Sequence, residues 1–345
     1  MGTNRRKNQN ATIYDIAEEL GISVSTVSRV LNGFEHVRAS TRQRVLEAAE
    51  RLGYVANVQA RSLAGGRSNM IGVVVPGVDN SYINAILSGI DDELARANLN
   101  LILYTTHREN RREAEYVRAV ANGMTDGLIL VVPLAWTSYL DALREQHFPY
   151  VIVDQSDPTN ASWTVQSTNW EGAYDATRYL IELGHRRIGF ITGLKALNSS
   201  LERLEGYKAA LRDHGIPIID SYIIEGDFWE PQGYEAGRKF LGMSRRPTAI
   251  FASNDLMAFG VLRAVWERGL SVPQDMSIVG FDDVPQAAYA HPALTTVQQP
   301  LEQMGRIAAR KVIDLIAHPG LPCERITLAT QLVIRQSCQP PSSTS

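Results

Sequence analysis

The chain has 345 residues, 44% of them hydrophobic and 21% charged, which is too long for one small core and suits a small module followed by larger α/β domains. Its net charge of −3 does not by itself indicate a polyanionic partner. Residues 1–64, however, hold nine Lys and Arg against six Asp and Glu, a net +3, so the remaining chain carries −6. Such a division is expected if only the N-terminal part meets phosphates.

The sequence excludes several other classes of protein. No run of about eighteen apolar residues occurs, and no apolar core of a signal peptide follows the first Asn, Arg and Lys residues. The two cysteines, Cys323 and Cys338, form neither a disulfide framework nor a metal-binding pattern. We therefore expect a cytoplasmic protein without a membrane anchor, metal or cofactor.

Residues 12–32 predict two short helices joined by a tight turn. Thr12 is a candidate N-cap, and Asp15 stands three residues later, as in a capping box. Gly21 is expected to end the first helix. The apolar positions of that helix recur at helical spacing: Ile13, Ile16, Ala17 and Leu20.

The second helix carries a polar face without acids. Ser23 is its candidate N-cap. The expected buried side holds Val24 or Val27, then Val30 and Leu31, and the opposite face holds Ser25, Thr26, Ser28, Arg29 and Asn32. This pattern favours a helix-turn-helix whose second helix enters a DNA major groove. An ordinary helical hairpin is the alternative, and it is disfavoured because every acid lies on the first helix.

A third helix is expected over residues 41–52, ended by Gly53. The following segment, residues 58–64, lies between Asn57 and Gly65 and is at most two helical turns long. So short a helix is unstable alone, so we expect a linker that folds on DNA.

From residue 69 the pattern changes to alternating strands and helices, which predicts two doubly wound parallel sheets. Expected strands cover residues 71–75, 101–104, 127–132, 150–153, 188–192, 222–225, 249–252 and 277–281. Expected helices cover residues 83–97, 111–122, 170–183, 201–214, 232–241, 255–268 and 301–317. A late strand over residues 326–334 is expected to return and, with the last helix, complete the lobes.

Ligands of such sheets bind beyond the carboxyl ends of the strands. The residues that follow strands here are Asp154, Arg203, Phe228, Asn254, Asp255, Asp282 and Asp283. Carboxylates, an amide, a guanidinium and an aromatic ring suit a polyhydroxylated ligand. For each Asp or Asn, a helix cap is the alternative role.

Nothing in the sequence indicates catalysis. The G-x-S-x-G, Walker A and G-x-G-x-x-G motifs are absent, and the seven histidines show no metal-ligand spacing. Asp282 and Asp283 are adjacent, so their side chains point in different directions and do not suit an acid/base pair. We expect no catalytic residues.

The chain resembles the LacI/GalR family of bacterial transcription regulators from about residue 12 to residue 335. The matching stretches are TIYDIAEELGISVSTVSRVLNG, VQARSLA before GRSNMIGVVVP, LGHRRIGFITG, RLEGYKAAL, FASNDLMAFGVLRA, SVPQDMSIVGFDD and PALTTVQQP. The resemblance implies a helix-turn-helix headpiece, a hinge helix and a two-lobed core similar to periplasmic binding proteins. It also implies a repressor that binds a palindromic operator as a homodimer and responds to a sugar or sugar-like effector between the lobes.

The resemblance also implies roles for individual residues. Val24, Ser25 and Arg29 match base-reading positions, and Leu63 matches a side chain that wedges into the minor groove. The other matches to DNA-contact or supporting positions are Thr12, Tyr14, Ser23, Thr26, Ser28, Asn32, His36, Asn57 and Ala60. The matches to effector-contact positions are Tyr82, Asp154, Arg203, Phe228, Asn254 and Asp282.

The expected domains are a headpiece at 1–57, a hinge at 58–66 and a core at 67–345. Within the core we expect a first lobe at about 69–166 and 299–323 and a second at about 167–298 and 324–338. Three residues depart from the family pattern: Ala56 before the hinge, Ser81 in place of a proline, and Thr168 in place of an aspartate. No leucine heptads end the chain, so a dimer is favoured over a tetramer. A solute-binding protein or an enzyme with the same lobes is the alternative function.

Overall fold

The structure is a computed structural model that describes residues 11–31, 36–54, 67–121, 123–157 and 159–342. The chain divides into two compact units, residues 1–68 and residues 69–345, and each is described by itself. The predicted hinge at 58–66, including Ala60 and Leu63, lies outside the described residues, as do Asn32, Ala56 and Asn57.

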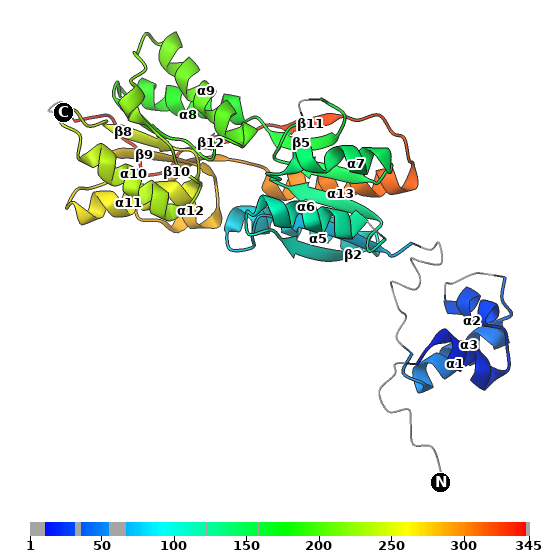
Figure 1. Cartoon of the computed structure of the whole chain (residues 1–345). Helices are drawn as coiled ribbons and strands as arrows, with labels where there is room; N and C mark the ends of the chain where they lie inside the picture. Colours follow the sequence, from blue (N-terminus) through cyan, green and yellow to red (C-terminus); the bar gives the residue numbers. More distant parts are fainter. Residues whose placement is uncertain (1–10, 32–35, 55–66, 122, 158, 343–345) are drawn as a thin grey trace. The chain divides into compact units, whose positions relative to one another are not determined.

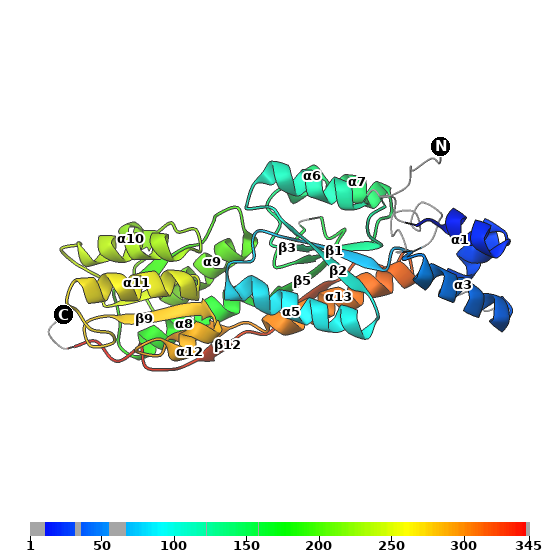
Figure 2. The same cartoon turned by 90° about the horizontal axis from the view of Figure 1, so that it is seen from below.

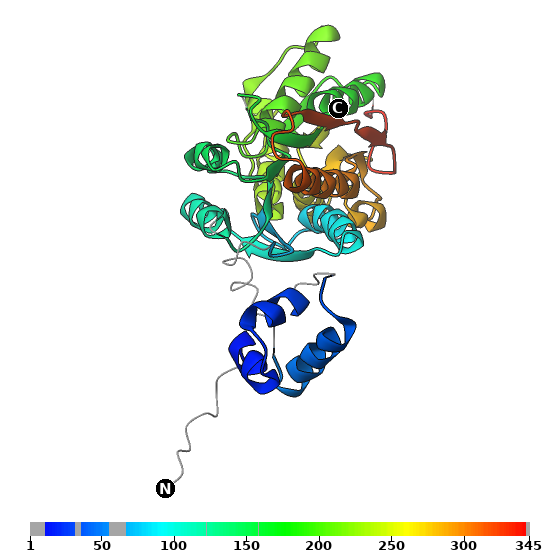
Figure 3. The same cartoon turned by 90° about the vertical axis from the view of Figure 1, so that its right-hand side faces the viewer.

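Over its described residues, 11–31, 36–54 and 67–68, the first unit contains three helices, shown in blue in Figure 3. They are α1 (Ile13–Leu20), α2 (Val24–Leu31) and α3 (Ala39–Arg51). Their shared core contains the buried side chains Ile16, Ala17, Val27, Val30, Val45, Ala48 and Ala49. Three short helices enclose this core because each presents one apolar stripe to the other two.

The predicted helix ends are confirmed. The backbone N–H of Thr12 donates to Asp15 Oδ2 at 2.7 Å, which is one half of the expected capping box. Gly21 ends α1 with φ of 63°, a left-handed conformation that costs glycine little. Ser23 Oγ accepts from the backbone N–H of Thr26 at 3.2 Å and caps α2.

The second unit contains two lobes, each built on a six-stranded sheet (Figure 1). The elements up to the first crossing are β1 (Met70–Val75), α5 (Ser81–Arg96), β2 (Asn100–Thr105), α6 (Asn110–Ala121), β3 (Gly127–Val131), η1 (Trp136–Ser138), α7 (Leu140–Glu145), β4 (Tyr150–Val153) and β5 (Trp163–Ser167). The chain then enters the second lobe with α8 (Asn169–Glu182), β6 (Ile188–Ile191), α9 (Asn198–Asp213), η2 (Asp220–Tyr222), β7 (Ile223–Ile224), α10 (Glu230–Leu241), β8 (Ala249–Ala252), α11 (Asp255–Glu267), β9 (Ser277–Asp282), α12 (Pro285–Tyr289) and β10 (Thr295–Gln298). The last elements are α13 (Leu301–Ala317), β11 (Arg325–Leu328) and β12 (Gln331–Val333).

The strand orders are β11-β5-β4-β3-β1-β2 in the first sheet and β12-β10-β9-β8-β6-β7 in the second. Every recorded pairing is parallel except that of β10 with β12. The predicted doubly wound α/β architecture is therefore confirmed.

Helices cover both faces of each sheet. In the first lobe α5 and α13 pack on one face, and α6 and α7 lie on the other (Figure 2). In the second lobe α8 and α9 cover one face, and α10 and α11 cover the other. Because both faces are covered, central strands such as β3, β4, β8 and β9 are buried along their whole length.

The chain passes between the lobes three times, after β5, after β10 and after β11. Hydrogen bonds join these crossings: Ser167 Oγ donates to Gln299 Oε1 at 2.5 Å, and the N–H of Thr330 donates to Thr168 Oγ1 at 2.8 Å. Thr168, one of the three departures from the family pattern, therefore links two crossings.

One predicted element is wrong. The expected strand over 326–334 is two strands, since β11 pairs with β5 in the first sheet and β12 pairs with β10 in the second. Residues 325–328 therefore belong to the first lobe, although the second was expected to resume at about 324. The chain crosses at Thr330, whose side chain and backbone are held by Thr168.

The sequence patterns also missed β5, β10, α7 and α12. WTVQS alternates apolar with polar residues and TTVQ has one apolar residue, so neither strand contains a continuous apolar run. The two helices have six and five residues, too few for a helical period to be recognised. Within the described ranges, no helix combines the length and apolar character needed to cross a membrane.

Candidate functional site

The first candidate site is the exposed face of α2 in the headpiece. Ser25 and Arg29 are exposed, while Val27 and Val30 on the opposite side are buried. Ser23 Oγ lies 2.9 Å from Ser25 Oγ and 2.8 Å from Thr26 Oγ1, so three hydroxyls gather at the start of the helix. With hydroxyls, one guanidinium and no acid, this face can donate to base edges and phosphates.

The other predicted DNA-contact residues that the structure describes are accessible. Tyr14 is 67% exposed, Thr12 and His36 are exposed, and Val24, Thr26 and Ser28 are partly exposed. The sequence left open whether Val24 or Val27 is buried. In the structure the buried residues of α2 are Val27 and Val30. Val24 therefore remains accessible on the first turn of α2, the turn that reaches base edges in this motif.

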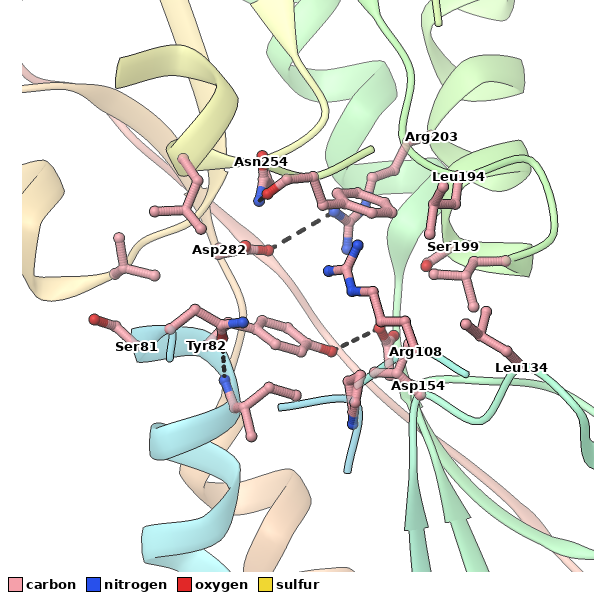
Figure 4. Close-up of a pocket in the computed structure, with 18 residues that line it drawn as sticks. Ser81, Tyr82, Arg108, Leu134, Asp154, Leu194, Ser199, Arg203, Asn254 and Asp282 are labelled. Atoms are coloured by element: carbon pink, nitrogen blue, oxygen red, sulfur yellow. Dashed lines mark hydrogen bonds and ion pairs between the residues drawn. The ribbon is translucent and has the colours of Figure 1, made fainter. Parts of the chain in front are cut away.

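The second candidate site is a pocket of the core between the two lobes (Figure 4). Its volume of about 70 Å³ is several times the space that one water molecule needs. It is lined by Pro76, Asn80, Ser81, Tyr82, Ile83, Arg108, Val132, Leu134, Asp154, Leu194, Leu197, Ser199, Arg203, Phe228, Asn254, Leu256, Asp282 and Val284. All six predicted effector-contact residues are in this set.

The pocket lies at the carboxyl ends of the strands, as expected. Asp154 follows β4, Asn254 follows β8, and Asp282 is the last residue of β9. Asp154, Phe228 and Asp282 have φ angles of 55°, 71° and 115°, which non-glycine residues adopt at a cost of roughly 1–3 kcal/mol each. Such backbone is retained where the surrounding contacts hold it, and here it turns two carboxyls and one aromatic ring into the pocket.

In the first lobe, Tyr82 and Asp154 form a pair. The Tyr82 hydroxyl donates to Asp154 Oδ2 at 2.6 Å, while Oδ1 of the same carboxylate is buried without a partner among the described residues. Burial raises the pKa of Asp154, although the Arg203 guanidinium opposes that shift. Burial and the Asp154 charge also raise the pKa of Tyr82 well above its usual value. Asp154 therefore has one oxygen available to accept from a ligand hydroxyl.

In the second lobe, Arg203 is the centre of a buried polar cluster. Its Nε donates to Asn169 Oδ1 at 2.9 Å, and its Nη1 donates to the backbone oxygen of Ser253 at 2.6 Å. Nη1 also lies 3.7 Å from Asp282 Oδ1, and the guanidinium carbon is 3.7 Å from the centroid of the Phe281 ring. These contacts fix the orientation of a cation that is 2% exposed.

Asp282 is held from its other side by Gln299, whose Nε2 donates to Oδ1 at 2.7 Å. Burial raises the pKa of Asp282 to about 7, while Arg203 and the Gln299 bond oppose the rise. A carboxyl that exchanges its proton near neutral pH can both donate to and accept from ligand hydroxyls.

Phe228 and Asn254 form one wall. Asn254 Oδ1 accepts from the N–H of Met257 at 3.0 Å and caps α11, and its Nδ2 donates to the backbone oxygen of Phe228 at 2.9 Å. The Phe228 ring lies against Gly193, where a built Cβ would come within 1.8 Å of the ring. The helix-cap role and the pocket role expected for Asn254 thus occur together.

Two strand-end residues do not line the pocket. Asp255 accepts from the Val284 N–H at 2.9 Å and from Thr296 Oγ1 at 2.5 Å, so it links the start of α11 to β10 and to the segment after β9. Asp283 pairs with Arg335 at 2.6 Å. Both carboxylates serve the fold.

Sequence reasoning missed Asn80, Ser81 and Arg108 in the pocket and Asn169 and Gln299 behind it. The first three were within reach, because Asn80 and Ser81 follow β1 and Arg108 follows β2. Applying the strand-end rule to every strand would have found them. Asn169 and Gln299 follow β5 and β10, two strands that the sequence patterns did not identify, so the same rule could not reach them.

Comparisons with known proteins identify both parts of the chain. Residues 12–57 match the family described as "Bacterial regulatory proteins, lacI family", and residues 177–338 match the "Periplasmic binding protein-like domain". Catabolite control protein A of Priestia megaterium is 35% identical over 95% of this chain and 99% of its own length. The transcriptional repressor PurR of Edwardsiella ictaluri is 36% identical over 95% of this chain and 96% of its own length.

Solved structures extend the likeness. A lac repressor dimer bound to operator and the anti-inducer ONPF has a TM-score of 0.84 against this fold, with 28% identity over 96% of this chain and 100% of that one. A complex of the transcriptional regulator CelR with cellobiose has a TM-score of 0.74 with 32% identity over 95% of this chain and 99% of that one. The fold and both sites define a two-part DNA-binding transcription regulator. The chain belongs to the lacI family of bacterial regulatory proteins.

Proposed function

We propose that this regulator is a repressor that binds a palindromic operator as a homodimer in the cytoplasm. We further propose that a sugar or sugar-like effector in the interlobe pocket changes its affinity for that DNA. One observation carries the proposal: a single chain holds both an acid-free polar face on α2 and a pocket of hydroxyl-binding groups between two lobes. The operator-bound lac repressor and the cellobiose-bound CelR, each similar in fold, support the two halves.

On the DNA side, Val24, Ser25 and Arg29 are the proposed base-reading residues. The exposed side chains of Thr12, Tyr14 and His36, with Ser23, Thr26 and Ser28, are proposed to contact the backbone or to support the reading residues. Asn32, Asn57, Ala60 and Leu63 complete the proposed set on the strength of the family resemblance alone. The proposed domains are the headpiece at 1–57, the hinge at 58–66 and the core from 67.

On the effector side, the two lobes contribute different groups. Tyr82 and Asp154 come from the first lobe, and Arg203, Phe228, Asn254 and Asp282 come from the second. A ligand that bridges them favours one arrangement of the lobes over another. If that arrangement changes DNA affinity by some factor, DNA must change effector affinity by the same factor.

Regulation is favoured over catalysis, because the sequence lacks the G-x-S-x-G, Walker A and G-x-G-x-x-G motifs and the curated relatives include transcriptional repressors. The direct test is a gel-shift assay with the DNA upstream of this protein's own gene, with and without sugars chosen by a thermal-shift screen. We expect specific binding that one sugar class strengthens or releases. Absence of specific binding to any sequence selected from a random library would refute the function.

The same selection tests the reading residues. Exchanging Val24 and Ser25 for other small residues should change the preferred operator bases, because both lie on the first turn of α2. An unchanged consensus sequence would show that other residues read the bases.

A further inference from the structure

One cation of the pocket, Arg108, has no role in the proposed effector site so far. It lies in the turn after β2, where the N–H of Arg108 donates to Thr106 Oγ1 at 3.2 Å and the N–H of Glu109 donates to the Thr106 oxygen at 3.0 Å. His107 and Arg108 have φ angles of 51° and 60°, an uncommon pair of left-handed residues. This turn sends the Arg108 side chain toward the middle of the pocket (Figure 4).

The guanidinium reaches across to the second lobe. Its Nη1 donates to the backbone oxygen of Asp227 at 2.9 Å, and its central carbon lies 4.8 Å from the centroid of the Trp229 ring. These contacts fix the plane of the guanidinium. Neither its Nε nor its Nη2 has an acceptor among the described residues, so two donor groups stay available on one edge.

The charge of Arg108 is also uncompensated at close range. Over the described residues, Arg203 has the Asp282 carboxylate 3.7 Å away, but no carboxylate lies within 4 Å of the Arg108 guanidinium. The charges that act on it are Asp227, whose Oδ1 accepts from the Trp229 N–H, and the exposed Asp79. Loss of water lowers the pKa of Arg108 in spite of these two charges. A half-buried cation without an ion pair gains most from an anion that enters with a ligand.

The acids in the rest of the pocket repel such an anion less than free carboxylates would. Asp154 and Asp282 are the two acids of the lining, and burial raises the pKa of both carboxyls. Each is next to a donor, Tyr82 or Gln299, and the Arg203 cation acts on both. The pocket therefore offers hydroxyl-binding groups on one side and an orientated guanidinium on the other.

We propose that the effector is an acidic sugar, with hydroxyls that bind Asp154 and Asp282 and a carboxylate or phosphate group that binds the free edge of Arg108. The inference rests on the proposed function, because it names the class of effector for the same pocket. A guanidinium edge fits a carboxylate or phosphate with two parallel hydrogen bonds, which a neutral hydroxyl cannot reproduce. The competing explanation is that Arg108 only holds the lobes together through Asp227 and Trp229.

The test uses the full chain and matched sugars in three forms: neutral, carboxylate and phosphate. The glucose set is glucose, glucuronate with gluconate, and glucose 6-phosphate, and galactose and ribose sets are chosen in the same way. Binding is measured by calorimetry for the wild type, Arg108→Gln, Arg108→Lys and the control Arg111→Gln. Arg111 lies three residues away, is 89% exposed and pairs with Glu115, so its removal takes a charge from the same region but not from the pocket.

We expect at least one acidic sugar to bind about tenfold or more tightly than its neutral parent. Arg108→Gln should remove that preference by lowering the affinity for the acidic sugar far more than the affinity for its neutral parent. Arg108→Lys should restore part of the preference, and Arg111→Gln should behave as the wild type. Comparison of the carboxylate with the phosphate compounds identifies which anion the site takes.

Three results would overturn the inference: equal affinity for neutral and acidic forms, equal losses for both in Arg108→Gln, or no binding of any acidic sugar. A gel-shift assay with the same compounds separates this failure from that of the proposed function. A neutral sugar that alters operator binding would leave the function standing without the acidic effector. An acidic sugar that binds through Arg108 but leaves DNA affinity unchanged would support the acidic ligand and contradict the proposed regulatory function.

Discussion

The headpiece and the interlobe pocket place their functional side chains in opposite surroundings. On α2, Ser25 and Arg29 are exposed, and the caps that form the helix come from residues within a few positions. In the pocket, Arg203 and Asp282 are 2% and 5% exposed, and their partners Asn169 and Gln299 come from distant parts of the chain. The headpiece residues can therefore change without disturbing the fold, whereas the pocket residues contribute to function and stability together.

The largest effect is expected at Arg203. Arg203→Ala leaves Asp282, Asn169 and the Ser253 carbonyl without their partner in a buried site, so it should destabilise the core by about 3–5 kcal/mol and abolish the effector response. Denaturant unfolding and calorimetry with the identified effector measure the two losses. Specific operator binding should persist at a temperature where the core is folded.

Arg212→Ala is the matched control for Arg203. Arg212 lies on the same helix, α9, and makes an exposed contact with Glu205, so its loss should change stability by no more than about 0.5 kcal/mol. An Arg203→Ala protein with wild-type stability and effector affinity would show that the pocket residues are as independent of the fold as those of the headpiece.

The next effect concerns pH. Burial raises the pKa of Asp282 from 3.8 to about 7, so the folded core holds this proton more tightly than the unfolded chain. The stabilisation is complete below about pH 4 and is lost as pH rises through 7, with a slope of at most about 1.4 kcal/mol per pH unit. Asp282→Asn should remove this part of the pH dependence. Thermal unfolding between pH 5 and pH 8 measures it, and identical slopes for the two proteins would contradict the expectation.

A smaller effect is expected for Arg29. Arg29→Ala should weaken operator binding by about 1–3 kcal/mol if this residue reads a base, and it should leave stability unchanged because the side chain is exposed. Titration of DNA into the variant, combined with unfolding measurements, tests both halves. Arg51→Ala on α3, which is 61% exposed and pairs with Glu19, is the control for loss of one headpiece charge. Equal losses in the two variants would assign Arg29 a general electrostatic role.

The smallest effect is expected for Ser23. Ser23→Ala removes the hydroxyl that accepts from the Thr26 N–H, and loss of an N-cap costs about 1 kcal/mol. Ser23→Asp keeps an acceptor at the cap, so it should preserve headpiece stability while placing a negative charge near DNA. Thermal unfolding should then rank Ser23→Asp above Ser23→Ala in stability, whereas Ser23→Asp should bind DNA more weakly than Ser23→Ala. The same order in both measurements would mean that Ser23 acts through stability alone.

The same contrast explains which features were predictable. The ends of α1 and α2 follow from Thr12, Asp15, Gly21 and Ser23, because capping acts between residues three or four positions apart. Asp154 and Asp282 were found as strand-end residues, because parallel sheets gather the carboxyl ends of their strands at one edge. Asn169 and Gln299 were missed because the sequence patterns did not identify β5 and β10, the strands that these two residues follow.

The sequence alone determined the helix-turn-helix and the two α/β lobes. It also determined six pocket residues: five of them, Asp154, Arg203, Phe228, Asn254 and Asp282, follow from strand ends as well as from the family resemblance, and Tyr82 follows from the resemblance alone. Only the tertiary structure decided that residues 325–328 return to the first sheet and that Arg108 reaches Asp227 and Trp229 of the other lobe. The physical reason is the range of the interactions. Caps and apolar periodicity are fixed by neighbours along the chain, whereas strand exchange and a cation without an ion pair depend on groups that only folding brings together.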